Sequence, residues 1–257
     1  MTFYCRAFKY RSAGGDELCD IYGGEEVIEG VERKRNAGEH CQVARKAEGP
    51  WSAEDDDLVE AIVGQVKLYK SSFKTLHGTE WLVDEVIDAY LHHLIGKHQE
   101  PIHQFDAVVS SALFSGKLDR LGKMRIPVED LWLCPVNFGA HWILVIVIMS
   151  KKVIVLMDPL GNEHNYVCKV QHNWSMFLEK YIPEEEVAQW NIHVLHHSNQ
   201  EDSSSCGVLI LMFAKEFLQT RTIQAVKTSA EDVANARLEI SSALLQYKVP
   251  EGRSKPI

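Results

Sequence analysis

Cys206 is the residue of this chain whose surroundings best suit a nucleophile. It lies between a polar segment, HSNQEDSSS, and an apolar stretch from Gly207 that has the composition of a buried helix. We therefore expect the Cys206 sulfur at a helix amino terminus, where unpaired backbone N–H groups and the helix dipole stabilise a thiolate. Gly207 would let a substrate backbone approach closely. A buried, unreactive thiol at the start of a core helix is the alternative that the local sequence leaves open.

His141 and Asp158 are the candidates for the base and its orienting acid. His141 directly precedes the apolar run 142–149, which predicts a central strand. At the end of such a strand the His141 ring can project into a cleft. A two-residue turn beginning at Ser150 would place Asp158 opposite Ile143, on the same face as His141. A register slip of one residue would send the two side chains to opposite faces. Asp158 could alternatively belong only to a strand-ending turn.

Gln200 lies six residues before Cys206 and completes a set suited to acyl transfer. That reaction places negative charge on a carbonyl oxygen, which the Gln200 side-chain N–H and the Cys206 backbone N–H can stabilise together. An ordinary loop amide is the other interpretation of Gln200.

The spacing of these residues resembles one protease family. His141-Trp142, an aspartate 17 residues after the histidine in a strand ending MDPLG, and Gln200 six residues before Cys206 resemble the ubiquitin-like-protein-specific cysteine proteases. This is the SUMO/sentrin-specific family, related to adenovirus proteinase. The segment WLVDEVI, beginning at Trp81, resembles the tryptophan-led helix of the family, and the resemblance covers roughly residues 75 to 248.

The resemblance implies an α+β fold of the papain-like or adenovirus-proteinase-like type, with a central mixed sheet flanked by helices. It implies that Cys206 is the nucleophile and His141 the general base and acid. Asp158 then orients the imidazole, and Gln200 is the oxyanion donor. No metal or cofactor is expected.

The resemblance also implies how a substrate is held. Trp81 and Trp142 match tryptophans that clamp the diglycine tail of a ubiquitin-like modifier, and Asp84 matches a position near the surface of the modifier. Two residues depart from the family pattern, since Ser205 replaces an aspartate and Val83 replaces a common asparagine. These departures concern the identity of the substrate more than the chemistry.

The implied activity is hydrolysis of the bond after the C-terminal diglycine of a modifier. The expected partners are SUMO, alternatively NEDD8 or ubiquitin, and its conjugates, and we expect a monomer. The alternatives are a non-catalytic modifier-binding module and a Cys-His-acid acyltransferase. A metal enzyme using His193, His196 and His197 is disfavoured, because strand alternation would point His196 away from the other two.

Composition limits the classes of function. The chain has 257 residues and a formal charge of -9, which opposes binding to a nucleic-acid backbone. The longest apolar run has eight residues, far below the ~20 of a membrane-spanning helix, and the amino terminus lacks a signal-peptide core. We therefore expect an intracellular protein of the nucleus, the cytoplasm or both, without membrane contact. Its six cysteines form no C-x-x-C pair and are expected to be thiols.

We expect three segments along the chain: a poorly ordered extension over 1–50, a catalytic domain over 51–250 and a tail over 251–257. Within the domain, β-rich runs follow from about residue 105, although the first of them, FDAVVSSALF, could equally be helical. Helices are expected in six places: from a Ser52 cap through 58–69, from a Thr79 cap to Gly96, and over 173–181, 184–190, 207–220 and 229–247.

Overall fold

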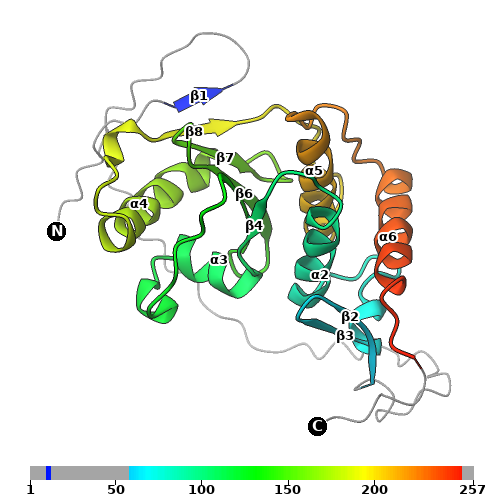
Figure 1. Cartoon of the computed structure of the whole chain (residues 1–257). Helices are drawn as coiled ribbons and strands as arrows, with labels where there is room; N and C mark the ends of the chain where they lie inside the picture. The colour runs from blue at the N-terminus through cyan, green and yellow to red at the C-terminus, as the bar shows by residue number, and fades with distance from the viewer. Residues whose placement is uncertain (1–9, 13–57, 251–257) are drawn as a thin grey trace, which may run out of the picture.

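A mixed six-stranded sheet forms the centre of this computed structural model, which describes residues 10–12 and 58–250 (Figure 1). Along the sheet the strands are β1 (Tyr10–Ser12), β8 (Asn191–Val194), β7 (Val153–Met157), β6 (Trp142–Ile148), β5 (Leu131–Asn137) and β4 (Ile102–Gln104). Strand β6 is antiparallel to both β5 and β7, and the outer pairs are parallel. The expected central mixed sheet is confirmed.

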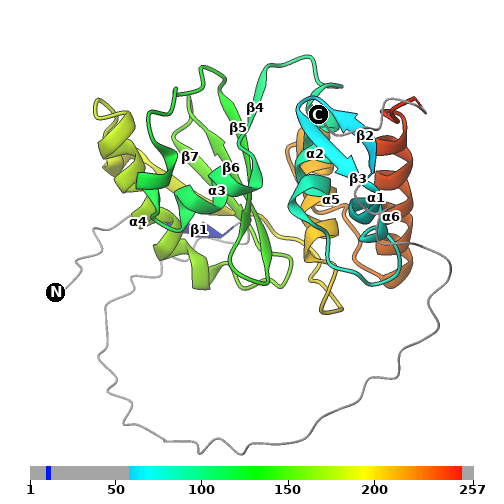
Figure 2. The same cartoon turned by 90° about the horizontal axis from the view of Figure 1, so that it is seen from below.

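Helices cover both faces of the sheet. The helical elements are α1 (Lys70–Lys74), α2 (Asp84–Ile95), α3 (Ala107–Phe114), η2 (Leu118–Leu121), α4 (His164–Tyr181), η3 (Val187–Gln189), α5 (Cys206–Thr220) and α6 (Ala230–Leu245). Helices α3 and α4 lie on one side of the sheet, and α5, α2 and α6 lie on the other (Figures 1 and 2). The chain is therefore an α+β structure with two layers of helix around one sheet.

Strand β6 is buried on both faces because its side chains alternate between two cores. Ile143 and Val145 pack into the core that contains α3 and α4 residues. Leu144 and Ile146 pack into the core that contains α2, α5 and α6 residues. The prediction of a central strand covered on both sides is confirmed.

The register of β6 and β7 follows the predicted turn. Leu144 pairs with Met157, so the next position places Asp158 opposite Ile143, as expected. Lys152 in the connecting turn has φ 51°, a left-handed conformation that an Asn-Gly turn would supply without strain. The register therefore does not depend on an ideal turn sequence, because the apolar faces of the strands also specify it.

The helix predicted over 58–69 is wrong. This segment forms a hairpin of β2 (Val59–Val63) and β3 (Val66–Tyr69), joined at Gly64 with φ 61°. A Cβ at Gly64 would lie 2.6 Å from Nε2 of His92, so α2 packs directly against this turn. Apolar residues at helical spacing misled the prediction, whereas β-branched residues on both sides of a glycine favour the hairpin.

Two other helix starts differ from the sequence prediction. Helix α2 begins at Asp84, with Val83 at the N-cap position, so Thr79 does not cap it, although Gly96 ends it as expected. Helix α4 begins at His164 rather than at residue 173, and the segment 184–190 contains only the 3₁₀ turn η3. The first turns of α4 are mostly exposed and therefore have few apolar residues at helical spacing, so the sequence offered no signal for a helix there.

The ambiguous run after residue 105 is a helix, α3, because Asp106 caps it. The Asp106 carboxylate accepts a hydrogen bond from the Val109 N–H at 2.7 Å. Helix α5 begins at Cys206, one residue before the predicted start. Helix α6 follows Ser229, whose hydroxyl accepts a hydrogen bond from the Asp232 N–H at 3.3 Å, as the predicted cap requires.

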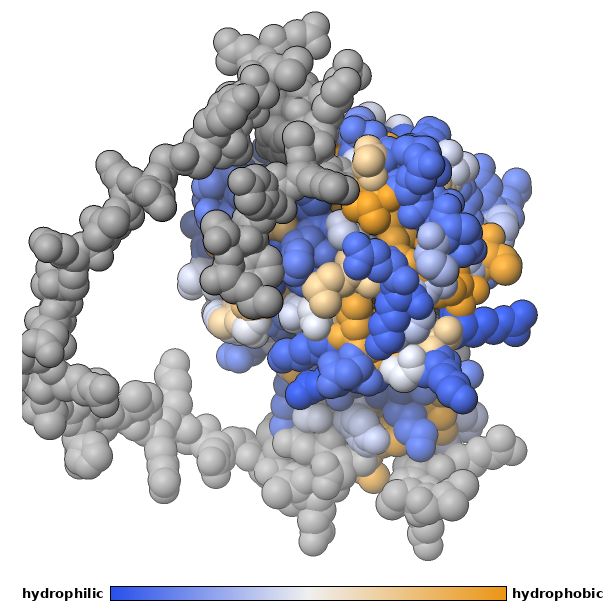
Figure 3. All heavy atoms as spheres, turned by 90° about the vertical axis from the view of Figure 1, so that its left-hand side faces the viewer, coloured by the Kyte–Doolittle hydropathy of each residue, from blue (hydrophilic) through white to orange (hydrophobic). Residues whose placement is uncertain are grey.

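The predicted domain boundaries lie largely outside the described residues. Within the expected extension only residues 10–12 are described, and they form β1 beside β8. The Ser52 cap and the tail 251–257 also lie outside the described residues, so the three-segment division remains a prediction. No helix of the described ranges is long and apolar enough to cross a membrane. On the face shown in Figure 3, hydrophilic side chains predominate around small apolar groups.

Asp88 links two helices through a buried carboxylate. Its Oδ1 accepts a hydrogen bond from the Ala107 N–H at 2.9 Å and so ties α2 to the start of α3. Burial raises the pKa of Asp88 to about 7, against the lowering effect of the Ala107 hydrogen bond, and repulsion from Asp106 and Asp84 raises it further. Folding therefore favours the protonated acid, and stability falls as the pH rises from about 4 to about 7.

We expect Asp88→Asn to remove this dependence, because an amide keeps the acceptor oxygen but cannot ionise. The free energy of unfolding of the variant, relative to the wild type, should rise by about 4 kcal/mol between pH 4 and pH 7 and stay constant above that range, since each pKa unit corresponds to about 1.4 kcal/mol. Urea unfolding across this pH range measures it, with the exposed Asp119→Asn as control. A constant difference at all pH values would contradict the prediction.

Candidate active site

Cys206 is the first residue of α5 and lies at the meeting point of α5 and the sheet. Its exposed fraction is 3%, and Ser205 precedes it at the N-cap position. The first N–H groups of a helix have no acceptor within the helix, so they can stabilise negative charge at this sulfur or on a substrate oxygen. The predicted placement of Cys206 at a helix amino terminus is what the structure shows.

His141 is held at the entrance to β6 by a tight loop after β5. The Phe138 N–H donates a hydrogen bond to the His141 carbonyl at 2.9 Å, and Gly139 takes φ 85°. A positive φ at this position explains the glycine. The loop aims the imidazole at both Cys206 and Asp158, since it interacts with both side chains.

Asp158 lies fully buried directly after β7, with a side-chain exposure of 0%. Its Oδ1 is 2.5 Å from Nε2 of His141. Two backbone donors also bind the carboxylate: the Leu160 N–H reaches Oδ1 at 2.9 Å and the Asn162 N–H reaches Oδ2 at 3.2 Å. These bonds fix the carboxylate, so Nε2 of His141 is committed to Asp158 and Nδ1 is left for the sulfur.

The protonated imidazole is strongly favoured in this arrangement. Burial acts to lower the pKa of His141, but hydrogen bonds to Asp158 and Cys206 and attraction by both groups outweigh it and raise this pKa to about 9. An imidazolium beside the sulfur stabilises a thiolate, which is the nucleophilic form of cysteine. The geometry can therefore support nucleophilic attack followed by proton donation to a leaving group.

An aromatic stack supports the imidazole from the outer side. The rings of His141 and Tyr166 are 6.5 Å apart, and those of Tyr166 and Phe138 are 5.2 Å apart. The Lys169 ammonium lies 3.8 Å from the centre of the Phe138 ring. Sequence reasoning did not identify Tyr166, because nothing in its local pattern on α4 separates it from an ordinary surface aromatic.

Gln200 lies close to the site but its amide is engaged. Its Nε2 donates hydrogen bonds to the Asp202 carbonyl at 2.8 Å and to Asp202 Oδ1 at 3.1 Å, while its Oε1 is buried without a partner. Donation to a substrate oxyanion therefore requires the amide to turn away from Asp202. The oxyanion role of Gln200 remains a prediction.

Asp202 organises the loop before Cys206. Its Oδ1 accepts hydrogen bonds from the backbone N–H groups of Ser204 and Ser205, both at 2.8 Å, and its Oδ2 accepts one from the Ser205 hydroxyl. Burial acts to raise the pKa of Asp202, but these bonds outweigh it and lower the pKa. Sequence reasoning missed Asp202, although an Asp followed two and three residues later by serines is a usual pattern of a side-chain-capped turn.

The residues predicted to hold a substrate divide between the surface and the core. Trp81, three residues before α2, is 48% exposed, and Asp84, the first residue of α2, is exposed, whereas Trp142 is only 5% exposed. A Cβ on Gly207 would lie 3.1 Å from the Leu82 Cβ and 3.3 Å from Trp142 Cδ1. Gly207 thus permits close packing of α5 against its neighbours, rather than leaving open space beside the sulfur.

A cleft of about 680 Å³ lies beside Trp142. Leu82, Val83 and Asp84 line it from the start of α2, and α3 and the β5–β6 loop form its other walls. Its rim also carries Lys117, Arg120 and Lys169, a local positive charge on an acidic chain. The cleft is large enough to hold an extended peptide segment.

The three clustered histidines do not form a metal site. His193 lies in β8, His196 is exposed, and Nε2 of His197 lies 2.7 Å from Glu163 Oε1. Within residues 10–12 and 58–250 no group of three or more His, Cys, Asp or Glu side chains could hold a metal ion.

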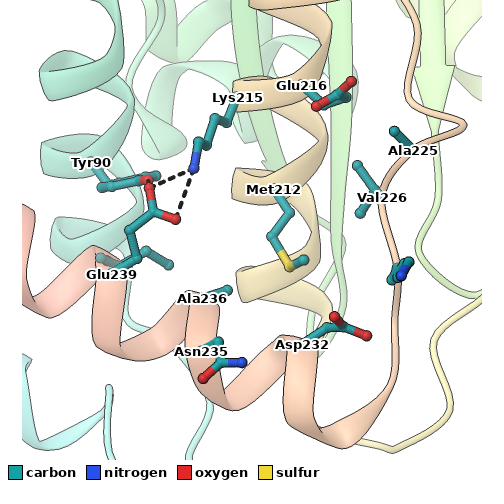
Figure 4. Close-up of a pocket in the computed structure, with 12 residues that line it drawn as sticks. Tyr90, Met212, Lys215, Glu216, Ala225, Val226, Asp232, Asn235, Ala236 and Glu239 are labelled. Atoms are coloured by element: carbon teal, nitrogen blue, oxygen red, sulfur yellow. Dashed lines mark hydrogen bonds and ion pairs between the residues drawn. The ribbon is translucent and has the colours of Figure 1, made fainter.

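A second cavity, of about 290 Å³, lies between α2, α5 and α6 (Figure 4). Glu239 accepts hydrogen bonds there from the Lys215 ammonium, at 2.6 and 2.8 Å, and from the Tyr90 hydroxyl at 3.2 Å. The Lys215 and Glu239 charges thus neutralise each other. Cys206, His141 and Asp158 are not among the residues that line this cavity.

Comparison with known proteins gives a family match. Residues 80–247, more than half of the chain, match the family model described as the Ulp1 protease family, C-terminal catalytic domain. Human (Homo sapiens) Sentrin-specific protease 2 is 23% identical over 216 residues, which are 74% of this chain and 35% of that protein. A Sentrin-specific protease of Caenorhabditis elegans is 26% identical over 189 residues, 68% of this chain and 27% of that protein. The chain thus spans about a third of the length of these curated relatives.

Solved structures share the fold. The C-terminal Ulp1 protease domain in complex with Smt3, the yeast ortholog of SUMO, has a TM-score of 0.61 at 18% identity and covers 76% of this chain and 96% of its own. The Ulp1-like SUMO protease catalytic domain of Chaetomium thermophilum has a TM-score of 0.57 at 20% identity, covering 74% and 83%. The predicted fold of the papain-like type is confirmed.

We expect Asp158→Asn to slow alkylation of Cys206 by iodoacetamide near neutral pH by about tenfold or more. Removal of the carboxylate lowers the pKa of His141 from about 9 toward its ordinary value of 6.5, so the imidazolium that stabilises the thiolate is lost above about pH 6.5. Mass spectrometry of the Cys206 peptide gives the rate at each pH.

The matched control is Asp130→Asn, since Asp130 bonds to Ser150 at the turn between β6 and β7. This variant should react like the wild type. Equal alkylation rates for Asp158→Asn and the wild type between pH 6.5 and 9 would show that Asp158 does not set the charge on His141.

Proposed function

The chain belongs to the Ulp1 protease family, and we propose that it is a cysteine isopeptidase that hydrolyses the bond after the C-terminal diglycine of a ubiquitin-like modifier. The observation that carries the proposal is the contact of one imidazole with two groups. His141 binds the buried Asp158 carboxylate at 2.5 Å and interacts with the Cys206 thiol at the start of α5. Acyl transfer needs a nucleophile, a base and an orienting acid in this relation.

The proposed reaction proceeds in two halves. With the Cys206 proton already on His141, the thiolate attacks the carbonyl carbon of the terminal glycine of the modifier. The tetrahedral intermediate collapses, the C–N bond breaks, and His141 gives its proton to the departing lysine amine. Water then attacks the thioester with His141 as base, which releases the modifier carboxylate and restores the thiol.

Helix α5 supplies part of the oxyanion stabilisation. The backbone N–H of Cys206 belongs to the first turn of the helix, where no carbonyl of the helix accepts it. In this proposal Gln200 supplies the second donor after its amide turns from Asp202, and Asp202 keeps its bonds to Ser204 and Ser205 during that turn.

SUMO is the proposed modifier, with NEDD8 and ubiquitin as the other members of the test panel. The relatives named above are sentrin-specific proteases, and one similar structure is a complex with Smt3, a SUMO ortholog. Trp81 at the surface and Trp142 beside the cleft are proposed to flank the diglycine tail, with Asp84 facing the modifier. Glycines are preferred there because larger side chains would not pass between two indoles.

We further propose a monomer that acts on free precursors or conjugates inside the cell, in the nucleus, the cytoplasm or both. The three residues of the proposed triad come from one chain and lie on adjoining elements, so the site is complete without a partner.

We expect a covalent adduct when the protein is incubated with SUMO that carries a thiol-reactive group in place of its C-terminal carboxylate. NEDD8 and ubiquitin probes of the same design should react more slowly by about tenfold or more, because the modifier body must fit the surface at Asp84 and Trp81. Gel shift and intact mass report the adduct.

Cys206→Ala is the matched control and should form no adduct with any probe, while Cys168→Ala should react normally. An adduct of wild-type protein that survives Cys206→Ala would overturn the assignment of the nucleophile. Complete failure of all three probes, with Cys206 still alkylated by iodoacetamide, would overturn the modifier class.

We expect Trp81→Ala to lower kcat/KM on the SUMO substrate by about tenfold or more, since an exposed aromatic anchor is lost from the binding surface. The rate of Cys206 alkylation by iodoacetamide should stay unchanged, because Trp81 is 48% exposed and is not bonded to the triad. The exposed Leu238→Ala on α6 serves as control. An equal loss in the alkylation rate would assign Trp81 a structural role.

A further inference from the structure

We propose that the ion pair between Glu163 and His197 is a positioning device for the active site, holding the Asp158 segment against the segment that leads to Cys206. This inference rests on the proposed function for its turnover assay only. Neither Glu163 nor His197 touches the reacting atoms, so both are positioning residues that act through Asp158 and the loop of Gln200.

Glu163 supports Asp158 through the backbone. Its Oε1 accepts a hydrogen bond from the Asp158 N–H at 3.0 Å, and its side chain is only 7% exposed. The Asp158 carboxylate is in turn fixed by Leu160 and Asn162, whose N–H groups belong to the same short segment. A shift of Glu163 therefore moves the backbone from which the catalytic carboxylate projects.

His197 completes the device from the other segment. Its Nε2 lies 2.7 Å from Glu163 Oε1 and its Nδ1 lies 2.9 Å from the Ser198 carbonyl, with a side-chain exposure of 3%. A carbonyl and a carboxylate can only accept, so both ring nitrogens must donate and the ring is an imidazolium. Burial acts to lower the pKa of His197, but these bonds and the attraction of Glu163 and Asp158 outweigh it and raise the pKa.

The segment after Asp158 and the segment before Cys206 make further contacts besides this ion pair. The Gln200 N–H donates to the Pro159 carbonyl at 2.6 Å, and a Cβ on Gly161 would lie 2.7 Å from Asn199 Oδ1. The His197 ring also packs on Phe213 of α5 at 4.9 Å between centroids. In Figure 1 the chain crosses from β8 to α5 through this segment. Among these contacts between the two segments, the ion pair is the buried charged one. It therefore fixes how the Asp158 segment lies against α5, which begins with Cys206.

The pair gives a physical account of His197, which the sequence offered only as a metal ligand. A buried charge is retained when it is paired and its remaining hydrogen-bonding capacity is used, as here by Ser198 and the Asp158 N–H. Displacements of about 1 Å in a supporting residue are enough to reduce catalysis by up to about a hundredfold. A positioning role therefore predicts a loss in the chemical step rather than in substrate binding.

The test compares Glu163→Ala with Glu163→Gln in the full chain. The glutamine carbonyl oxygen can take the place of Oε1 and accept from both the Asp158 N–H and the His197 Nε2–H, so this variant should keep kcat within about threefold of the wild type. The alanine removes both bonds and should lower kcat, and the rate of Cys206 alkylation by iodoacetamide, by about tenfold or more, with KM changed less than about twofold. Thermal melting confirms that each variant is folded at the assay temperature.

His197→Phe and His197→Gln give a second comparison if Glu163→Ala does not fold. Phenylalanine keeps the packing on Phe213 but not the bond to Glu163 and should show the same losses, whereas glutamine can still donate to Glu163 and should not. Glu129→Ala is the matched control, since Glu129 lies 3.8 Å from His103 beside β4, at the opposite edge of the sheet.

Wild-type alkylation and kcat in a folded Glu163→Ala or His197→Phe variant would overturn the inference. So would equal losses in Glu163→Ala and Glu163→Gln, because the glutamine preserves the contacts. Alkylation uses no modifier, so it tests the positioning role even where no modifier probe reacts and the proposed function fails.

Discussion

The hydrogen bond between His141 and the buried carboxylate of Asp158 is the interaction on which the proposed chemistry depends. A histidine at the end of a strand is an ordinary feature, and so is a cysteine at the start of a helix. The carboxylate changes both, because it holds the imidazole in one orientation and favours its charged form. That charge lies beside the sulfur of Cys206, where it stabilises a thiolate. The rest of the molecule can be understood as the scaffold that keeps these three groups in contact.

The scaffold achieves this by bringing three separate elements to one end of the sheet. Strand β6 begins beside His141, strand β7 ends beside Asp158, and α5 begins with Cys206. Two hydrophobic cores fix β6 between the helical layers, so neither the strand nor the helix can slide without exposing apolar side chains. The buried cores thus fix the positions of the strands and of α5. Hydrogen bonds within the short polar loops then orient the side chains of the site.

The loop before Cys206 departs locally from the family pattern. An aspartate commonly precedes the nucleophile in the family, and here Ser205 takes that position. Asp202 instead binds the backbone of Ser204 and Ser205 and the Ser205 hydroxyl, so a carboxylate still organises the approach to Cys206. His197, at the start of the same polar segment, bonds to Glu163. The backbone N–H groups of Ser204 and Ser205 thus have an acceptor without an aspartate at position 205.

The sequence by itself determined the strongly patterned parts: the doubly buried strand β6, its register with β7, helix α5 and the spacing of Cys206, His141 and Asp158. Continuous apolar runs and strand alternation encode these features locally. Only the tertiary structure decided between a weak helical period and the hairpin over residues 59–69, whose turn at Gly64 packs against His92 of α2. Likewise, the roles of Glu163, His197 and Tyr166 arise from contacts between segments distant along the chain. A single sequence records residue types and spacings, whereas a buried ion pair or a ring stack exists only once folding has brought its members together.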